Sequence, residues 1–522
     1  MVFDVGDHVD RAHFITEGSD GKANVQLMNQ LGYDYVTIGN NEGITFSKSQ
    51  LDELYREADF QVLINNLYEK NGRRPSWLLP YAVHHLGGLK IGIIGTTVDF
   101  SSFYSLLGWK IADPVQAVAE NVRRLREHVD VLIVLSHLGL ARDKLLAQKV
   151  PGIDLILGAH THHFLPDGLK AEQTWIHQVG KFGRFVGHVT LETAEGKVDV
   201  YPRALAVDDE EDDPGAQALL SRWEAYARQR LSQEVAVLEE PLEADWFNES
   251  VIGNILAEAL NDWCKTQIAL VNSGQILAGC PAGPITKKDL HHICPHPINP
   301  CRIRLSGRQI WSVLQRSLED DVQQLEIKGL GFRGKKLGML SVDGLRIEYE
   351  RSAQDQKNVR AIYVGKVPIQ LEKWYDVATI DMFTFGAIFP EIYEQTDVCY
   401  FLPVFLRDVL AERFKKDIWN GPKKIGGHVR QTEEEWIMKF INDLYDLYKD
   451  QLVGDEEDAV ALVLYTLQDH SREDLLSLIH EMSDDEVYQM VGQFLINQLK
   501  DKMAKEGLGQ HRPSSRDRKN IH

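Results

Sequence analysis

Residues 157–163 read Leu-Gly-Ala-His160-Thr-His162-His163, so a histidine pair with one residue between its members closes an apolar run. Such a pair is typical of a metal site that takes further ligands from elsewhere in the chain. Three earlier apolar runs also end in side chains that can bind a metal, and they occupy residues 2–11, 36–42 and 133–139. Because open α/β sheets place their sites at the carboxyl ends of strands, we expect these four run ends to meet. Oxygen and nitrogen ligands without thiolate suit Mn, Fe, Zn, Ni or Co.

The length and charge of the chain limit the kinds of partner it can have. At 522 residues it exceeds what one hydrophobic core holds, so two or three domains are expected. The formal net charge of -20 disfavours a nucleic-acid polymer, because no basic surplus exists to neutralise a phosphate backbone. A small phosphate ester is compatible with this charge, since a bound dication inverts the local field.

The cysteines and the apolar runs indicate in which cellular compartment the protein is expected to fold, and they favour the cytoplasm. Five cysteines, odd in number and widely spaced, argue against a disulfide scaffold and favour reduced thiols. The sequence opens without a signal-peptide pattern and has no run of about 18 apolar residues, so secretion and a membrane partner find no support. We therefore expect a cytoplasmic protein that acts on a small molecule.

Residues 1–206 are predicted to form a layered α/β domain, because short apolar runs alternate with helical patterns. Helices are expected at 26–31, 48–58, 114–129 and 142–148, and strands at 61–64, 91–95, 131–135 and 155–157. A further strand at 185–192 is expected to close the sheet.

A second domain of mixed α/β structure is predicted at 248–430, with a helix at 251–263 and a buried strand at 268–271. An acidic linker and a connecting helix at 207–247 are expected to join it to the first domain. Three prolines between Cys294 and Cys301, and the lack of a second Cys-x-x-Cys, argue against a zinc site around His296.

From residue 431 the sequence becomes acidic and helical, and a small all-helical module is predicted for 431–506. Met438 stands at the start of this pattern, as if an independent reading frame had been joined there. The polar tail 507–522 is expected to be disordered. We expect the module to have no part in the chemistry.

Four motifs follow one another in the order GDHVDR, GNNE, SHLG and GAHTHH. In this order the chain resembles the calcineurin-like binuclear metallophosphatases, and within them the 5'-nucleotidase branch of the bifunctional UDP-sugar hydrolase/5'-nucleotidase type. The resemblance covers about residues 1–430 and includes the second domain, whose Asn-x-Gly turn and aromatic loops look like that branch's substrate domain. It implies a metallophosphatase α/β sandwich followed by a 5'-nucleotidase C-terminal-type domain.

The resemblance also implies a set of metal ligands. Asp7 would bridge two cations, and His162 would bind the first of them. Asn40, His137 and His160 would complete the shell of the second cation. Two cations roughly 3.5 to 4 Å apart hold a bridging hydroxide in line with phosphorus and neutralise the developing charge. Hydrolysis of a phosphate ester without a covalent intermediate would follow.

Two departures from the family pattern bear on catalysis. The family usually has histidine after the ligand asparagine, whereas Asn41 stands here, and an amide donates a hydrogen bond but is no general acid. His8 or His163, each next to a proposed ligand, could replace that histidine. The family's first Asp-x-His motif lies some tens of residues before GDxxD, but here only six residues precede Asp7.

An Asp-x-His sequence does occur at 289–291, but it lies in the second domain and is not taken as the missing motif. We therefore expect the first metal to keep only Asp7 and His162, and one cation to be firmly held. We also expect the missing strand to be encoded just upstream.

The family holds a nucleoside base between two aromatic rings of the second domain. Phe332 and Phe385 are the candidates here, with Asn272 and Arg333 as polar contacts. The family's Asn-x-Gly-Gly-x-Arg segment reads Asn-Ser-Gly-Gln-Ile-Leu at 272–277 and lacks its arginine.

The sequence thus predicts a metal-dependent hydrolase of a small phosphate ester, of the 5'-nucleotidase or cyclic-nucleotide phosphodiesterase type. The alternative is a non-catalytic nucleotide- or metal-binding protein on the same scaffold, which Asn41 and the absent first motif favour.

Overall fold

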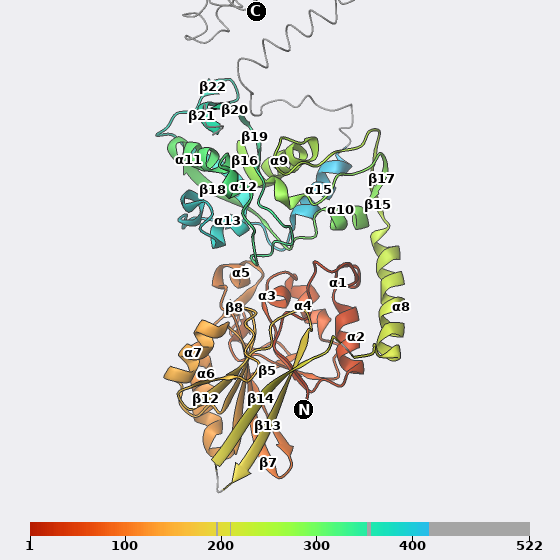
Figure 1. The fold of residues 1–522 in the computed structure, drawn as a ribbon, viewed down its shortest axis with the longest axis vertical. Helices are drawn as coiled ribbons and strands as arrows, with labels where there is room; N and C mark the ends of the chain where they lie inside the picture. The colour runs from red at the N-terminus through yellow and green to blue at the C-terminus, as the bar shows by residue number, and fades with distance from the viewer. Residues whose placement is uncertain (195–196, 209, 352–356, 417–522) are drawn as a thin grey trace, which may run out of the picture. The chain divides into compact units, whose positions relative to one another are not determined.

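The computed structural model describes residues 1–416, apart from residues 195–196, 209 and 352–356 (Figure 1). The predicted module at 431–506, the tail at 507–522 and the junction at Met438 lie outside the described residues. Within the described part, no helix has the length and the apolar character that crossing a bilayer requires.

A parallel four-stranded sheet in the order β1-β2-β3-β5 forms one layer of the first domain. Its strands are β1 (Phe3–Asp4), β2 (Tyr35–Val36), β3 (Gln61–Leu63) and β5 (Leu78–Leu79). The helices that follow β1 and β2 are α1 (Phe14–Ser19), α2 (Lys22–Gln30), α3 (Asn40–Gly43) and α4 (Lys48–Leu54). A capping box between Ser47 and Gln50 begins α4, as its sequence requires.

A six-stranded sheet in the order β11-β12-β10-β9-β7-β6 forms the second layer, and its four central strands are parallel. The strands are β6 (Tyr81–Leu86), β7 (Leu89–Thr97), β9 (Val131–His137), β10 (Leu155–Gly158), β11 (Leu169–Ala171) and β12 (Thr174–His177). Every residue of β9 is buried, which explains its unbroken apolar sequence. The helices of this half are α5 (Ser101–Leu106), α6 (Pro114–Leu125) and α7 (Leu140–Lys149), and a short ribbon pairs β4 (Leu67–Glu69) with β8 (Trp109–Ile111).

The two sheets pack face to face through apolar side chains. Tyr35 and Leu63 of the first sheet share one core cluster with Ile93, Ile133 and Leu135 of the second. The outer face of the six-stranded sheet packs against residues of α6 and α7, and the outer face of the other sheet against α2 and α4. The predicted layered α/β sandwich is therefore confirmed.

One predicted strand has a different partner. Residues 185–192 were expected to close the sheet, but β13 (Phe185–Ala194) pairs only with β14 (Lys197–Ala206), as a separate antiparallel ribbon. The prediction was wrong because a ten-residue partner follows β13 directly in sequence, and a hairpin satisfies its backbone groups locally.

The connecting segment contains one long helix, α8 (Pro214–Leu231), which begins after the capping carboxylate of Asp213. It packs on the first domain, where Arg230 lies 2.6 Å from Asp20. Figure 1 shows α8 alongside α1 and α2.

The second domain is built on a mixed sheet in the order β19-β16-β23-β18-β24. These strands are β16 (Ile268–Asn272), β18 (Pro300–Ser306), β19 (Leu340–Asp343), β23 (Trp374–Ile380) and β24 (Cys399–Tyr400). The helices are α9 (Val251–Cys264), α10 (Lys287–Ile293), α11 (Gly307–Ser317), α12 (Asp320–Gln323), α13 (Met382–Phe385), α14 (Pro390–Tyr393) and α15 (Leu406–Lys415). Smaller sheets pair β15 (Glu234–Leu238) with β17 (Gly283–Thr286), and β20 (Leu345–Arg351) with β21 (Lys357–Val364) and β22 (Val367–Pro368). The mixed α/β class of this domain is confirmed.

Candidate active site

Three of the predicted ligands converge in the first domain. One ligand atom each of Asp7, His137 and His160 lies within 4.8 Å of the other two, and this is the only such His, Cys, Asp or Glu group among the described residues. Asp7 follows β1, His137 ends β9, and His160 follows β10. Each residue thus lies at the carboxyl end of a parallel strand, where the strand-end pattern placed it. We call these three residues the metal cluster.

The backbone at this site is strained. Asp7, His160 and His162 have φ angles of 66°, 73° and 56°, in the left-handed region that side chains with a Cβ rarely adopt. Three of the five predicted metal ligands are therefore held in costly conformations, which is common where a site is preorganised.

Two glycines leave the space that the cluster occupies. A Cβ on Gly39 would lie 2.1 Å from Oδ1 of Asp7 and 2.6 Å from Nε2 of His137. A Cβ on Gly6 would lie 2.7 Å from Nδ1 of His137, and the φ of Gly6 is +90°. Larger residues at these positions would therefore displace the ligands.

The contact between Asp7 and His137 fits a bound cation. Nδ1 of His137 lies 2.7 Å from the carbonyl oxygen of Val5 and donates to it, which turns Nε2 toward Oδ2 of Asp7 at 3.2 Å. Burial disfavours the imidazolium, but the charge of Asp7 raises the pKa of His137 to about 9. The pair thus holds a proton that a metal ion would displace.

His160 and Asn40 offer further ligand atoms. Nδ1 of His160 lies 2.9 Å from Oδ1 of Asn40, the first residue of α3, and the His160 ring is 5.2 Å from that of His137. Burial, and then the charge of His137, lowers the pKa of His160 to about 4. His160 is therefore a neutral imidazole at physiological pH, the form that binds metals.

Glu42 is a buried carboxylate beside the metal cluster that the sequence analysis did not assign a role. Its side chain is 1% exposed, and its carboxylate accepts hydrogen bonds from the backbone N–H groups of Asp7, Gly39 and Val9 at 2.9, 2.8 and 2.8 Å. Burial, and then the charge of Asp7, raises the pKa of Glu42 to about 7. Glu42 joins the loop that carries Asp7 to the loop that carries Asn40. The available signal was the acidic residue that ends GNNE.

Asn41, His8 and His163, which were predicted to help in catalysis, have different surroundings. The backbone N–H of Asn41 donates to Oδ1 of Asp7 at 2.8 Å, and its side chain accepts from Asn40 at 3.4 Å. The His8 ring packs edge-on against Tyr33, with Nδ1 buried and without a hydrogen-bond partner. His162 and His163 are exposed, and neither belongs to the metal cluster.

The four predicted substrate residues separate into two pairs. Asn272 is fully buried, where it donates to the carbonyl of Leu337 at 2.8 Å and accepts from Gln275 at 2.8 Å. Phe332 is 4% exposed and stacks on His296, with ring centroids 5.0 Å apart. These two side chains lie in the core of the second domain and are not presented on its surface.

Arg333 and Phe385 instead face the first domain. Nη2 of Arg333 lies 2.9 Å from Oδ2 of Asp10, three residues after Asp7. The Phe385 ring is 6.0 Å from that of Phe100, and the Phe100 ring is 6.1 Å from that of His160. Two successive ring contacts therefore link this second-domain aromatic residue to the metal cluster.

Two histidines of the second domain, His296 and His291, have hydrogen-bond partners in the protein. His296 lies 3.0 Å from the carbonyl of Gln275 and 2.9 Å from the N–H of Arg333, and all five cysteines are free thiols. Both ring nitrogens of His296 therefore have hydrogen-bond partners. His291 lies 3.0 Å from the carbonyl of Arg11, and Asp289 caps α10, so the Asp-x-His sequence at 289–291 has structural partners.

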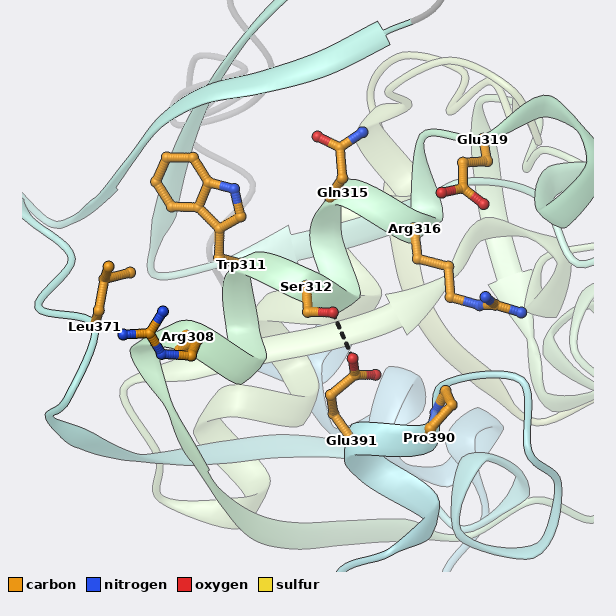
Figure 2. Close-up of a pocket in the computed structure, with 9 residues that line it drawn as sticks. All are labelled: Arg308, Trp311, Ser312, Gln315, Arg316, Glu319, Leu371, Pro390 and Glu391. Carbon is orange, nitrogen blue, oxygen red and sulfur yellow. Dashed lines mark hydrogen bonds between the residues drawn. The ribbon is translucent and has the colours of Figure 1, made fainter.

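A pocket of about 580 Å³ lies in the second domain over α11. Figure 2 shows Trp311 and Arg316 on this helix and the bond from Ser312 to Glu391 of α14 across the pocket. No residue of the metal cluster lines it, so it is separate from the candidate active site.

Known proteins match three parts of the chain. Residues 1–164 match the calcineurin-like phosphoesterase family, and residues 234–388 match the C-terminal domain of 5'-nucleotidase. Residues 438–515 match a family of unknown function (DUF6154).

Individual relatives extend over most of the chain. The metallophosphoesterase YunD of Bacillus subtilis (strain 168), named as uncharacterized, is 41% identical over 416 residues, which are 79% of this chain and 90% of YunD. The 5'-nucleotidase of Rattus norvegicus is 26% identical over 433 residues, 72% of each protein. The structure of Haemophilus influenzae NAD nucleotidase aligns with a TM-score of 0.55 at 18% identity, over 83% of this chain and 90% of that one. This likeness shows a shared fold.

Proposed function

The chain belongs to the calcineurin-like metallophosphoesterases that carry a 5'-nucleotidase C-terminal domain, and we propose that it hydrolyses a nucleotide or a related small phosphate ester. The contact between Asp7 and His137 carries this proposal, because a carboxylate oxygen and an imidazole nitrogen 3.2 Å apart hold a proton that a bound cation would replace. When bound, a divalent cation lowers the pKa of water and neutralises charge on phosphoryl oxygens.

We assign the ligands of one firmly held cation to Asp7, Asn40, His137 and His160, with His162 as a ligand of a second cation. The four residues offer oxygen and nitrogen atoms without thiolate, a set that suits Mn, Zn, Fe, Co or Ni. The remaining residues would bind and orient the ester. Arg333 carries a guanidinium that could leave Asp10 and bind a phosphate oxygen, while the Asn41 side chain could donate to the leaving group.

The aromatic residues support a substrate with a planar base. Phe385 is 37% exposed, and its ring is nearly parallel to that of Tyr400, at an angle of 7° and a centroid distance of 6.5 Å. Planar groups bind well against such ring faces. A non-catalytic binding protein is the second candidate, because Asn41 cannot serve as a general acid.

Turnover and metal content together separate the two candidates. The full chain would be assayed with Mn²⁺ and three esters: AMP, p-nitrophenyl phosphate and bis-p-nitrophenyl phosphate. Turnover that is lost in His160→Gln but kept in His188→Gln, which alters an exposed histidine of β13, supports the proposal. Firm Mn²⁺ binding without turnover of any of the three esters would contradict it and favour the binding protein.

A further inference from the structure

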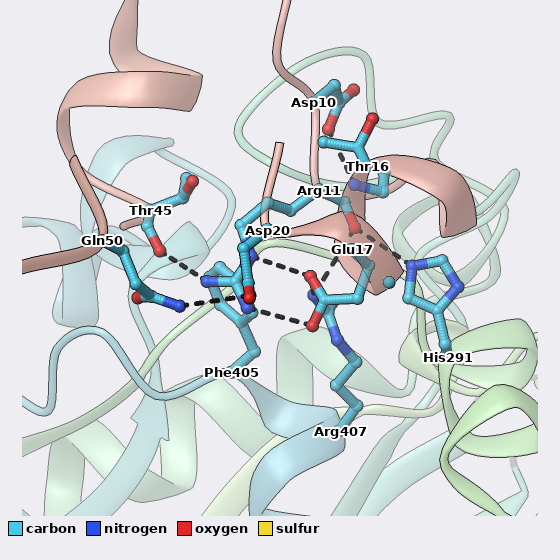
Figure 3. Close-up of polar contacts among 12 residues, drawn as sticks. Asp10, Arg11, Thr16, Glu17, Asp20, Thr45, Gln50, His291, Phe405 and Arg407 are labelled. Atoms are coloured by element: carbon cyan, nitrogen blue, oxygen red, sulfur yellow. Dashed lines mark hydrogen bonds and ion pairs between the residues drawn. The ribbon is translucent and has the colours of Figure 1, made fainter. Parts of the chain in front are cut away.

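A buried ion-pair triad connects the metal-bearing loop to the second domain (Figure 3). Arg11 lies four residues after Asp7 and binds the carboxylate of Glu17 with both Nε and Nη2, at 2.7 and 3.0 Å. Arg407 of α15 approaches the same carboxylate at 2.9 Å. The side chains of Arg11, Glu17 and Arg407 are only 10%, 13% and 4% exposed, so solvent screens these charges little.

A chain of hydrogen bonds links Arg11 to the metal cluster. Its Nη1 donates to the carbonyl of Thr45 at 2.7 Å, and the Thr45 hydroxyl donates to the carbonyl of Asn41. The N–H of Asn41 in turn donates to Oδ1 of Asp7 at 2.8 Å. One side chain therefore fixes the loop of Asp7 and the loop of Asn41 relative to each other.

Three more second-domain side chains contact residues 10 and 11 of the same loop. His291 of α10 lies 3.0 Å from the carbonyl oxygen of Arg11, and Arg333 lies 2.9 Å from the carboxylate of Asp10. The ring of Phe405 lies 4.5 Å from the guanidinium carbons of both Arg11 and Arg407. Residues 10 and 11 are thus bound by groups from several second-domain segments.

Arg407 supplies one of the two positive charges that compensate the buried carboxylate of Glu17. Loss of one partner from a buried ionic network leaves the others uncompensated, and the chain must rearrange to solvate them. Without Arg407, the Glu17 carboxylate would keep only Arg11. We therefore expect Arg11 to move, and with it the loop of Asp7 and the loop of Asn41.

We propose that Arg407 is a positioning residue, through which the second domain sets the geometry of Asp7 and hence the affinity for the catalytic cation. This inference rests on the proposed function for its metal. It assigns to the last described helix, some 400 positions away in sequence, a role in a site of the first domain.

The test compares three variants of the full chain by calorimetric titration with Mn²⁺. Arg407→Gln keeps hydrogen-bond donors but removes the charge, and we expect its Mn²⁺ affinity to fall about tenfold, as for other supporting residues of metal sites. Arg407→Lys keeps the charge but has no second nitrogen to donate to the carbonyls of Pro295 and His296, so we expect an intermediate affinity. Arg304→Gln, in an exposed pair with Asp376, is the control and should bind Mn²⁺ as the wild type does.

Wild-type Mn²⁺ affinity in a folded Arg407→Gln variant would overturn the inference. If that variant does not fold, wild-type affinity in Arg407→Lys would overturn it instead. Where turnover is measurable at saturating Mn²⁺, we expect kcat to fall more than KM rises, because Arg407 acts on the metal loop and does not touch the substrate. Should the wild type hydrolyse no ester, the proposed function fails, but the order of Mn²⁺ affinities still tests this inference.

Discussion

The carboxylate of Glu42 accepts the backbone N–H of Asp7 at 2.9 Å, so a buried acid of one loop holds the backbone of a proposed metal ligand on another. We expect Glu42→Gln to weaken Mn²⁺ binding about tenfold, as loss of a supporting bond to a ligand does. An amide would also turn an N–H group toward a backbone N–H, so the free energy of unfolding should fall by about 1–3 kcal/mol. Titration with Mn²⁺ and denaturant unfolding measure the two effects.

Glu53→Gln is the matched control, because Glu53 lies on the neighbouring helix α4 with a side chain 58% exposed. Glu53→Gln should change neither the Mn²⁺ affinity nor the free energy of unfolding. Unchanged Mn²⁺ affinity in Glu42→Gln would mean that Asp7 keeps its place without this bond.

Gly39→Ala tests the space around the ligands. The new Cβ would lie 2.1 Å from Oδ1 of Asp7, so either the carboxylate or the loop must move. Since the backbone of Gly39 does not need a positive φ, we expect the domain to fold and metal binding to be lost. Gly215→Ala is the control, since its Cβ would meet the movable end of Gln30. Metal content per chain and the thermal midpoint decide between a local and a global effect.

The strand-end pattern predicted that Asp7, His137 and His160 would meet, because each follows or ends an apolar run and parallel strands deliver their carboxyl ends to one edge. His137 and His160 could therefore be placed without knowing the angle between the two sheets. Family motifs named Asp7 and Asn40, and the strained backbone at Asp7 and His160 agrees with a preorganised site.

The second domain was less predictable, because an aromatic residue near glycine has no periodic pattern that fixes its exposure. Phe332 and Arg333 are adjacent in sequence, yet one is buried against His296 and the other reaches Asp10. The contact between Glu17 and Arg407 joins residues 390 positions apart, and nothing local in either sequence indicates it. Only the docking of the two domains brings these charges together.

The raised pKa of Asp381 should make the stability of the second domain depend on pH. Burial raises the pKa of Asp381 to about 8, against about 3.9 for an exposed aspartate. Between these values the folded chain binds more protons than the unfolded chain, so the free energy of unfolding falls as pH rises from about 4 to about 8. The stabilisation is complete below pH 4 and lost above pH 8.

An amide cannot ionise, so Asp381→Asn should remove this contribution. The free energy of unfolding of the variant, relative to the wild type, should therefore rise by at least about 1 kcal/mol between pH 5 and pH 8. Asp376→Asn, at a side chain 59% exposed, should show no such trend. If the stability of Asp381→Asn relative to the wild type stayed constant with pH, the raised pKa of Asp381 would be contradicted.

Truncation tests whether the segment after the second domain takes part in the chemistry. The metal cluster and the triad lie within residues 1–416, and residues 438–515 match a separate family. We therefore expect a chain ending at Glu435 to remain folded, with the Mn²⁺ affinity of the full chain. Insolubility of this chain, or loss of metal binding, would show that the later residues are needed.

Phe385 allows recognition of a base to be separated from recognition of a phosphate. Its ring lies 5.3 Å from Phe103 of α5 and nearly parallel to Tyr400, so it can offer a face to a planar base. Phe385→Leu keeps an apolar side chain but removes the π-face, and loss of base stacking costs about 1–3 kcal/mol. We therefore expect KM for AMP to rise about tenfold or more, while KM for ribose 5-phosphate, which has no base, stays the same. Trp374→Leu removes another exposed aromatic ring of this domain and should change neither constant. Equal changes for both esters in Phe385→Leu would show that the ring supports the domain contact and does not bind a base.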